Sequence, residues 1–375
     1  MPSGEQPLAI QTSVPLAPLT TLGIGGSAEW FIRATTIKEV VDAHEWCRER
    51  AVPFNVMGGG SNLVVADGGV KGLVLQVAIG GVDVSSRGDT TLLRVGAGEP
   101  WDAAVAVVVS RGLHGVECLS GIPGSTGGTP VQNVGAYGQE VADTIAAVTV
   151  LDRQSGEVGK LRGTDCGFGY RTSRFKTEDV GRFVVCEVTY ELNHEPPTVR
   201  YPDLAHFIER RDIRSPNVAD VREAVLLIRR MKGMVLDATD SDTRSVGSFF
   251  MNPIVETSHH GKLGAATGPA PGFALPTGRV KVPAAWLIEQ AGFGKGYRSG
   301  AVGLSSKHPL AIVNRGGATA RDVVALARQI KQRVADRFDV RLRPEPTFVG
   351  FGDDADVAYL LDSAAAEAAA LRNHL

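Results

Sequence analysis

The sequence predicts an α+β protein built in two parts, and three observations support this fold class. Its 375 residues exceed what one average hydrophobic core accommodates, so two or more domains are expected. Short valine-rich runs bounded by glycine dominate the first half, which indicates many short strands and few helices. A proline-broken stretch, NHEPPTVRYPDL, then separates this half from a second mixture of helices and strands.

Residues 1–20 are polar and interrupted by proline, which predicts an irregular arm. Residues 21–194 carry the strands, which are expected in the runs FNVMGGGSN, LVLQVA, TLLRVGAG, AAVTVLD and FVVCEVTYEL. Two helices intervene in this part. The first begins after Thr36, which forms the pattern of a capping box with Glu39 three residues later. The second covers about residues 101–111.

Residues 195–350 form the second part, in which polar caps mark the starts of the helices. Asn217 is expected to cap a helix whose buried face extends to Met231. A longer helix is expected to begin at Thr319, with Asp322 as its capping-box partner. The alanine-rich end, residues 351–375, predicts an added helix.

Charge and cysteine content narrow the class of protein. The 39 basic and 41 acidic residues leave a net charge of −2, which gives no reason to expect nucleic acid or an anionic membrane as partner. The four cysteines form no C-x-x-C pair, and no apolar run is long enough to span a bilayer. The eight histidines show no metal-binding spacing, so no metal is expected. These features predict a cytoplasmic protein with free thiols.

Two glycine-rich stretches carry the first chemical signal. In VMGGGSNLVV a strand runs into consecutive glycines, which let backbone N–H groups approach a phosphate, and a serine and an asparagine add donors. A tight turn between strands is the alternative. The second stretch, LSGIPGSTGGTPVQNVGAYGQEV, has a density of glycine, small hydroxyl and amide residues that a surface loop does not need. Together they fit a dinucleotide with a long, flat ring system. Neither G-x-G-x-x-G at a strand-to-helix turn nor a P-loop motif occurs.

Ordered motifs give a specific resemblance. TTLGIGGSAEW, GGGSNLVV, IPGSTGGTPVQNVGAYG, CGFGYRTSRFK, VGSFFMNP, AAWLIEQAG and RPEPTFVG occur in the order found in the UDP-N-acetylenolpyruvoylglucosamine reductase (MurB) family. The resemblance covers about residues 15–350. It implies an enzyme that uses FAD and NADPH to reduce UDP-N-acetylglucosamine enolpyruvate to UDP-N-acetylmuramate for peptidoglycan synthesis.

The resemblance also implies a fold and a cofactor site. Residues 21–194 would form an FAD-binding domain of the vanillyl-alcohol-oxidase (PCMH) type, and residues 195–350 a smaller substrate-binding domain. The first glycine loop contains neither histidine nor cysteine, so the FAD is expected to be non-covalent. The expected cofactor-binding residues are Gly58, Gly59, Gly60, Ser61, Asn62, Gly121, Ile122, Pro123, Gly124, Thr126, Gly128, Asn133, Gly135 and Ala136.

Three catalytic positions follow from the motifs of the family. They fall on Arg171 in GYRTSRFK, Ser248 in GSFFMNP and Glu345 in RPEPTF. A bidentate guanidinium suits a carboxylate on which negative charge builds up, Glu345 would share that role, and Ser248 would supply a proton. By composition alone, Arg171 could be a surface ion pair, Glu345 an exposed loop residue and Ser248 a buried serine that bonds to its own backbone.

The remaining expectations concern substrate and partners. The resemblance places Tyr137, Arg171, Tyr201, Lys232 and Asn252 at the substrate, with Tyr201 on a loop that covers it; Tyr201 could instead anchor a linker. The partners are then small molecules, with a monomer favoured. Two other functions stay open at this point: another FAD-dependent oxidase or dehydrogenase acting on sugars or lactones, and a flavin- or nucleotide-binding module without turnover.

Overall fold

All the valine-rich runs expected as strands form strands in the computed structural model, which describes residues 8–264 and 268–361. The chain divides into two compact units that do not follow the linear order of the sequence. Unit 1 comprises residues up to Val14, Ala28–Gly60 and Val70–Val235, and unit 2 comprises Pro15–Ser27, Ser61–Gly69 and residues from Leu236 onward. The functional boundaries expected at residues 20, 194 and 350 stay predictions, because the compact units are defined by contacts and combine separate stretches of the sequence.

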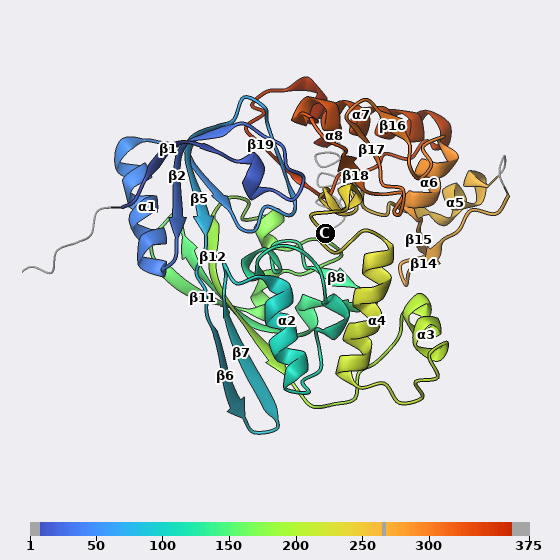
Figure 1. Cartoon of the computed structure of the whole chain (residues 1–375), viewed down its shortest axis with the longest axis horizontal. Coiled ribbons are helices and arrows are strands. Elements are labelled where there is room, and N and C mark those ends of the chain that lie inside the picture. Colours follow the sequence, from blue (N-terminus) through green and yellow to red (C-terminus); the bar gives the residue numbers. More distant parts are fainter. Residues whose placement is uncertain (1–7, 265–267, 362–375) are drawn as a thin grey trace, which may run out of the picture. The chain divides into compact units, whose positions relative to one another are not determined.

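Among its described residues, unit 1 contains two large sheets with different strand directions (Figure 1), besides a two-stranded hairpin near the site. In the first, with order β1-β2-β5-β3, strands β2 and β3 both run parallel to β5. The second, with order β11-β10-β12-β7-β6, is antiparallel throughout. The strands of the first are β1 (Gln11–Pro15), β2 (Ser27–Ala34), β5 (Val70–Val77) and β3 (Phe54–Met57). Those of the second are β11 (Val158–Arg162), β10 (Ile145–Asp152), β12 (Phe183–Leu192), β7 (Thr90–Gly96) and β6 (Val82–Arg87).

The N-terminal segment is not irregular throughout, contrary to the expectation for residues 1–20. Residues 11–15 form β1, which joins the edge of the first sheet beside β2. The strand is short and mostly exposed, so it lacks the alternation of apolar and polar residues that identifies a strand in a sequence. Residues 1–7 lie outside the described part of the chain.

Helices α1 (Ile37–Arg50) and α2 (Trp101–Ser110) share one hydrophobic core with both sheets of unit 1. The predicted capping box of α1 is present: Thr36 accepts a hydrogen bond from the Glu39 amide, and Glu39 accepts one from the Thr36 amide. Val40 and Cys47 are buried on the inner face of α1, and Leu73 of β5 belongs to the same core. This core fixes the ends of the strands from which the site loops start.

Helices α3 (Pro202–Glu209) and α4 (Val218–Met231) also belong to unit 1, although both lie in the part expected as the second domain. They form a small apolar cluster with Cys118, and α4 lies beside α2 (Figure 1). Asn217 caps α4 in a capping box with Asp220, as the sequence predicts. Met231 was expected on the buried face but is 60% exposed, because the cluster packed against α4 ends at Ile228.

Unit 2 is built from short strands packed with four helices among the described residues. Strand β4 (Leu63–Val65) pairs in parallel with β19 (Thr347–Val349). Two three-stranded sheets have the orders β13-β15-β14 and β16-β17-β18. Their strands are β13 (Ile254–Glu256), β15 (Arg279–Lys281), β14 (Phe273–Ala274), β16 (Arg298–Ser299), β17 (Val302–Leu304) and β18 (Ile312–Asn314). The helices are α5 (Thr257–Leu263), α6 (Ala284–Gln290), α7 (Ala320–Phe338) and α8 (Ala355–Leu361).

Helix α7 is the longest element of unit 2 and begins with the predicted capping box of Thr319 and Asp322. Its Lys331 is 2% exposed, and the Nζ atom donates to the carbonyl oxygens of Tyr359 and Leu360, at 2.8 Å each. A buried cation therefore holds the last turn of α8, where the carbonyl groups of a helix lack partners. Of the alanine-rich helix expected at residues 351–375, residues 362–375 lie outside the described part.

Candidate active site

The first glycine loop follows β3 and packs closely against the second within unit 1. The Gly59 amide donates to the Ser125 hydroxyl at 3.1 Å. A Cβ atom at Gly58 would lie 2.3 Å from the same hydroxyl, and one at Gly59 would lie 2.9 Å from the Cα atom of Gly124. Only glycine fits at Gly59, because a methyl group there would meet backbone, whereas one at Gly58 would displace the Ser125 hydroxyl. The sequence predicted both loops, and the structure brings them into contact.

The second glycine loop is held by the helix and the turn beside it. The Gly121 amide donates to the Asp102 carboxylate at 2.6 Å, and the Trp101 amide donates to the Gly124 carbonyl at 3.0 Å. Thr126 uses both its amide and its hydroxyl on the Glu99 carbonyl, at 2.9 and 3.1 Å. The Gly121 and Thr126 amides therefore have protein partners. Both residues were predicted from the sequence to bind a cofactor. Their hydrogen bonds to protein groups hold the loop in its conformation.

Asp102 connects the second glycine loop to α2 and α4. Its carboxylate accepts two hydrogen bonds from Arg222, at 2.6 and 2.9 Å, in addition to the one from Gly121. Burial would raise the pKa of Asp102, but these three hydrogen bonds outweigh burial and leave the pKa lowered. The carboxylate stays charged and fixes the start of the loop. Sequence analysis missed Asp102, although an acidic residue in the first turn of an otherwise apolar helix was a usable signal.

A short hairpin follows the second glycine loop and is braced from within. Strands β8 (Gly135–Ala136) and β9 (Gln139–Glu140) pair around a turn that contains Tyr137, whose φ is +49°. Gln139 donates to the Glu117 carboxylate at 2.8 Å and accepts from the Cys118 amide at 2.8 Å. Glu117 is fully buried, so the hydrogen bond between Gln139 and its carboxylate is shielded from solvent. Sequence analysis missed Glu117, which stands between the apolar residues Val116 and Cys118.

Asn133 has a different place from the one expected. Its side chain is fully buried and bonds only to protein groups, which are Glu140, Gly169 and the amide of Ala142. The expectation that Asn133 binds the cofactor can therefore hold only for its backbone. Ile122, also expected at the cofactor, is partly buried against the main core of unit 1, as is Ala136.

Arg171 stands in a tight turn in which Gly169 and Thr172 exchange backbone hydrogen bonds of 3.0 and 3.2 Å. Its own φ is +55°, a conformation that residues with a Cβ atom rarely adopt. The guanidinium Nη2 donates to the carbonyl oxygen of Gly135 at 2.6 Å. Arg171 is thus half-buried and held against the hairpin, and its catalytic role stays a prediction.

Tyr137 and Tyr201 meet in unit 1, as do Lys232 and Asp203. The two tyrosine rings are edge to face, with centroids 5.5 Å apart. Burial raises the pKa of both tyrosines. The Lys232 ammonium lies 3.6 Å from the carboxylate of Asp203, which is in the first turn of α3, directly after Tyr201. The segment around Tyr201 is therefore in contact with other residues predicted at the substrate.

Arg229 of α4 is a further cation of this group that sequence analysis did not assign. Its Nη2 donates to the Met234 carbonyl at 2.8 Å, while its Nε is buried without a hydrogen-bond partner. Burial lowers its pKa, the charge of Arg171 lowers it further, and Tyr137 opposes this. Two guanidinium groups and a lysine therefore lie in one part of unit 1, which suits an anionic ligand.

Unit 2 brings Ser248 and Glu345 onto neighbouring segments. The Glu345 amide donates to the Phe249 carbonyl at 2.9 Å, and the Phe249 amide donates to the Leu310 carbonyl at 2.8 Å. Met251 and Arg343 continue the pairing with a 2.9 Å bond. The serine and the glutamate are both half-buried. The backbone therefore sets the spacing of the two predicted catalytic residues.

The two phenylalanines after Ser248 form the support of this pair. Phe249 and Phe250 are 0% and 1% exposed, with ring centroids 5.2 Å apart. Phe249 also meets the ring of Phe348, at 6.3 Å. Ser248 is therefore the half-buried end of a segment whose next two side chains lie in the core of unit 2. The role of Ser248 as proton donor stays a prediction.

Ser61, Asn62 and Asn252 were expected at the cofactor or the substrate, and each also has a structural contact in unit 2. The Ser61 carbonyl accepts from Thr21 at 3.4 Å. The Asn62 side chain donates to the Glu345 carbonyl at 3.3 Å. The Asn252 Oδ1 accepts from the Ala284 amide at 2.9 Å and so supports the start of α6. Their expected ligand contacts stay predictions.

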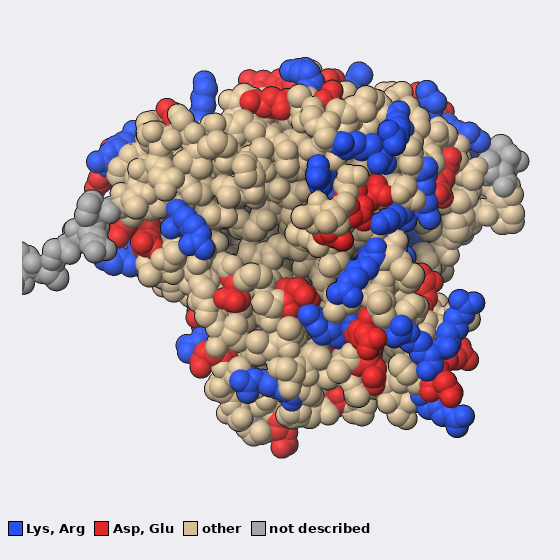
Figure 2. Space-filling view, in the orientation of Figure 1, with Lys and Arg blue, Asp and Glu red and all other residues tan. Residues whose placement is uncertain are grey.

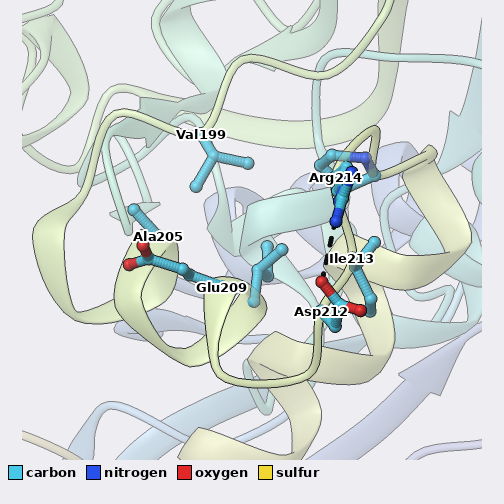
Figure 3. Close-up of a pocket in the computed structure, with 8 residues that line it drawn as sticks. Val199, Ala205, Glu209, Asp212, Ile213 and Arg214 are labelled. Atoms are coloured by element: carbon cyan, nitrogen blue, oxygen red, sulfur yellow. Dashed lines mark ion pairs between the residues drawn. The ribbon is translucent and has the colours of Figure 1, made fainter.

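A pocket of about 490 Å³ lies between the end of α3 and the start of α4. Figure 3 shows its lining residues, with an ion pair between Asp212 and Arg214 at 3.7 Å. None of the predicted site residues is among the described residues that line it, and both members of the ion pair are exposed. The candidate site is therefore not assigned to this pocket.

Within the described ranges, no group of histidine, cysteine and acidic residues has the arrangement of a metal site, and no helix is long and apolar enough to cross a membrane. The four cysteines are free and buried. Burial raises the pKa of the Cys47 thiol to about 11 and that of Cys118 to about 12, so both stay protonated near neutral pH. On the face shown in Figure 2, acidic and basic side chains are interspersed.

The glycine loops fit a dinucleotide cofactor. At Gly59 a Cβ atom would collide with the backbone of the facing loop, so two backbones approach each other there without a side chain between them. Gly128 instead faces open space, with no atom within 4 Å of a built Cβ. Backbone exposed in this way offers amide groups to phosphates and lets a flat ring approach.

Comparison with known proteins decides the family. The model for the C-terminal domain of UDP-N-acetylenolpyruvoylglucosamine reductase matches residues 237–349, and the model for an FAD binding domain matches residues 28–162. A UDP-N-acetylenolpyruvoylglucosamine reductase from Thermobifida fusca is 47% identical over 349 residues, which cover 90% of this chain and 97% of that protein. One from Streptomyces coelicolor is 48% identical over 92% of this chain and 91% of its own length. This chain belongs to the UDP-N-acetylenolpyruvoylglucosamine reductase family.

A solved structure agrees with this assignment. The reductase (MurB) from Thermus caldophilus superposes with a TM-score of 0.63 at 26% identity, covering 92% of this chain and 99% of that protein. The α+β fold class and the FAD-binding domain expected from the sequence are confirmed. The roles of the individual site residues stay predictions.

Proposed function

We propose that this chain reduces UDP-N-acetylglucosamine enolpyruvate to UDP-N-acetylmuramate with non-covalent FAD and NADPH, a step in the synthesis of peptidoglycan precursors. Membership of the reductase family supports this function. The observation that carries it is the backbone pairing of Phe249 with Glu345, which places Ser248 and Glu345 on paired segments of one unit. A protein that only bound a flavin would need no such pair.

The cofactor would be held by backbone and small side chains. We assign to it the loop residues Gly58, Gly59, Gly60, Ser61 and Asn62, together with Gly121, Ile122, Pro123, Gly124, Thr126, Gly128, Gly135 and Ala136. Asn133 would contribute its backbone alone, because its side chain is bonded within the protein. Bound FAD, once reduced by NADPH, supplies the hydride for the outer carbon of the enolpyruvyl double bond. Because one cofactor domain is present, NADPH and the enolpyruvyl sugar would use the site in turn.

Arg171 would hold the carboxylate of the enolpyruvyl group. When hydride adds to the outer carbon, negative charge builds up on the α-carbon and its carboxylate. A guanidinium is always protonated and can bind a carboxylate through two N–H groups. Its left-handed backbone and its hydrogen bond to Gly135 fix the Arg171 side chain in advance, which avoids reorganisation during the reaction.

Ser248 would complete the reduction by giving its hydroxyl proton to the α-carbon. The enol ether thereby gains one hydride and one proton and becomes a lactyl ether. Glu345, held at the backbone of Phe249, would share the carboxylate with Arg171 by hydrogen bonding. The buried rings of Phe249 and Phe250 would keep bulk water from reaching the carbanion.

The nucleotide part of the substrate would meet Tyr137, Tyr201, Lys232 and Asn252. Lys232 already holds a carboxylate, that of Asp203, so it is placed to hold a phosphate instead. Tyr201 lies at the start of α3 and is 39% exposed, and we propose that its segment covers the substrate. A cytoplasmic location also belongs to the proposal, supported by four free cysteines; a monomer is favoured.

One assay tests this function. The purified protein is mixed with NADPH, and oxidation is followed with and without UDP-N-acetylglucosamine enolpyruvate. We expect rapid oxidation only with the enolpyruvyl sugar, and UDP-N-acetylmuramate as product. Oxidation that ignores this sugar, or that responds instead to simple sugars or lactones, would support the alternative of an FAD-dependent oxidase or dehydrogenase.

A further inference from the structure

The side chain of Asn133 connects two segments that meet at Arg171. Its Nδ2 donates to the Glu140 carboxylate at 2.8 Å and to the Gly169 carbonyl at 3.0 Å, and its Oδ1 accepts from the Ala142 amide at 3.1 Å. Glu140 belongs to the hairpin that includes Gly135, and Gly169 belongs to the turn of Arg171. One side chain therefore ties the hairpin to the turn.

The chemistry of these partners allows only one orientation of the amide. A carboxylate and a carbonyl oxygen are acceptors only, whereas a backbone N–H is a donor only. Turning the Asn133 amide around would place its oxygen against two acceptors and its nitrogen against a donor. Since the side chain is 0% exposed, all of its hydrogen bonds stay within the protein.

Several residues of the same region have a strained backbone. Among the described residues, seven that are not glycine have a positive φ, and three of them are Asn133, Tyr137 and Arg171. Such conformations are unfavourable for residues with a Cβ atom and persist where the surroundings fix them. Asparagine tolerates this conformation better than most residues, while arginine does not. The turn of Arg171 therefore requires support from its neighbours.

Both ends of Arg171 depend on this support. Its guanidinium donates to Gly135 at 2.6 Å, and a Cβ atom at Gly135 would lie 3.1 Å from its Nη1. Its backbone lies in the turn that Asn133 binds through Gly169. We propose that Asn133 is a positioning residue for Arg171, setting where the guanidinium meets the substrate carboxylate. This inference rests on the proposed function, because it assumes that Arg171 binds that carboxylate.

The test uses Asn133→Asp in the FAD-loaded, full-length protein. Aspartate keeps the size of the side chain but loses both donors and brings a second carboxylate to Glu140. We expect flavin reoxidation by UDP-N-acetylglucosamine enolpyruvate to slow about 100-fold, since a misplaced binding group can cost this much. Flavin reduction by NADPH should change by no more than about twofold. FAD content should remain that of the wild type.

A second variant and a control make the outcome decisive. Asn133→Gly keeps the positive φ without adding charge, so it serves if the aspartate variant does not fold. Asn55→Asp, in which a side-chain amide also bonds to backbone carbonyls, should leave both half-reactions unchanged. Equilibrium binding of UDP-N-acetylmuramate to the oxidised protein, measured by calorimetry, should weaken in the Asn133 variants alone.

A double-mutant cycle separates positioning from other roles. If Asn133 acts through Arg171, adding Asn133→Gly to Arg171→Ala should slow reoxidation by no more than about twofold further. Losses that simply add would overturn the proposal, as would loss of FAD or equal damage to both half-reactions. If the wild type itself does not reduce the enolpyruvyl sugar, the proposed function fails. If the wild type does so and Asn133→Asp is equally fast, only the positioning role fails.

Discussion

The two units hold their predicted catalytic residues in different ways. In unit 1, Arg171 has a strained backbone and lies in a turn that the buried Asn133 side chain binds, and the buried Glu117 braces the hairpin. In unit 2, the segments of Ser248 and Glu345 are held by backbone hydrogen bonds, and the Phe249 ring is buried in the core. Substituting a polar residue in unit 1 should therefore move the Arg171 side chain. In unit 2, the Ser248 hydroxyl and the packing of Phe249 can be altered separately.

Ser248→Ala gives the largest expected effect and tests this separation. Removing the hydroxyl leaves the backbone bonds of Phe249 in place, so the fold should not change. Flavin reoxidation by the enolpyruvyl sugar should slow by about a thousandfold, the scale of a lost proton donor, while reduction by NADPH stays nearly intact. Stopped-flow absorbance of the flavin measures both steps. Equal damage to both would mean that Ser248 is structural.

Phe249→Ala should do the reverse and remove the support. The ring is 0% exposed and packs against Phe250 and Phe348, so its loss should lower the free energy of unfolding by about 3–5 kcal/mol. Chemical denaturation followed by circular dichroism checks this value. Phe273→Ala, at a 59% exposed ring in the same unit, is the matched control and should cost far less. A small loss at Phe249 would mean that packing does not hold the pair.

A smaller, pH-dependent effect is expected at the polar support of unit 1. His114 Nδ1 donates to the Glu117 carboxylate at 2.8 Å, and this hydrogen bond raises the pKa of His114. Burial would raise the pKa of Glu117, but the hydrogen bonds from His114 and Gly115 outweigh it and leave the pKa lowered. Both ionised forms are therefore favoured by folding.

These shifts fix the pH window of the effect. The contribution of His114 is fully present below its unfolded pKa of about 6.5 and is lost as the pH rises through its raised folded value. The contribution of Glu117 is present above its unfolded pKa of about 4.3 and is lost as the pH falls through its lowered value. His114→Gln should therefore lower the free energy of unfolding by about 1 kcal/mol more at pH 5.5 than at pH 9. His194→Gln, at an exposed histidine bonded to a carbonyl, should show no such difference. A pH-independent loss at His114 would contradict the ionised pair.

Local chemistry made much of the fold predictable from the sequence. The starts of α1, α4 and α7 follow from capping boxes, in which the partners stand three residues apart. The strands follow from valine-rich runs, and the two glycine loops from their composition. The motifs of the reductase family occur in order along the chain and indicate the family without the structure.

Contacts between distant residues were not predictable in the same way. Nothing near Asn133 in the sequence shows that its amide turns inward to Gly169, which lies 36 residues away. Nor does the Gly121 amide reveal that Asp102 binds it. The division into units escaped prediction for the same reason, because Pro15–Ser27 and Ser61–Gly69 join residues from Leu236 onward only through tertiary packing.

The pairing of β4 with β19 has a consequence for how the protein is made. Next to these strands, the Asn62 side chain donates a hydrogen bond to the Glu345 carbonyl, although the two residues are 283 positions apart in the sequence. During synthesis β4 leaves the ribosome long before β19 and stays without its partner until β19 has been translated. Closing so long a loop is slow, so we expect unit 2 to fold later than the local hairpins of unit 1.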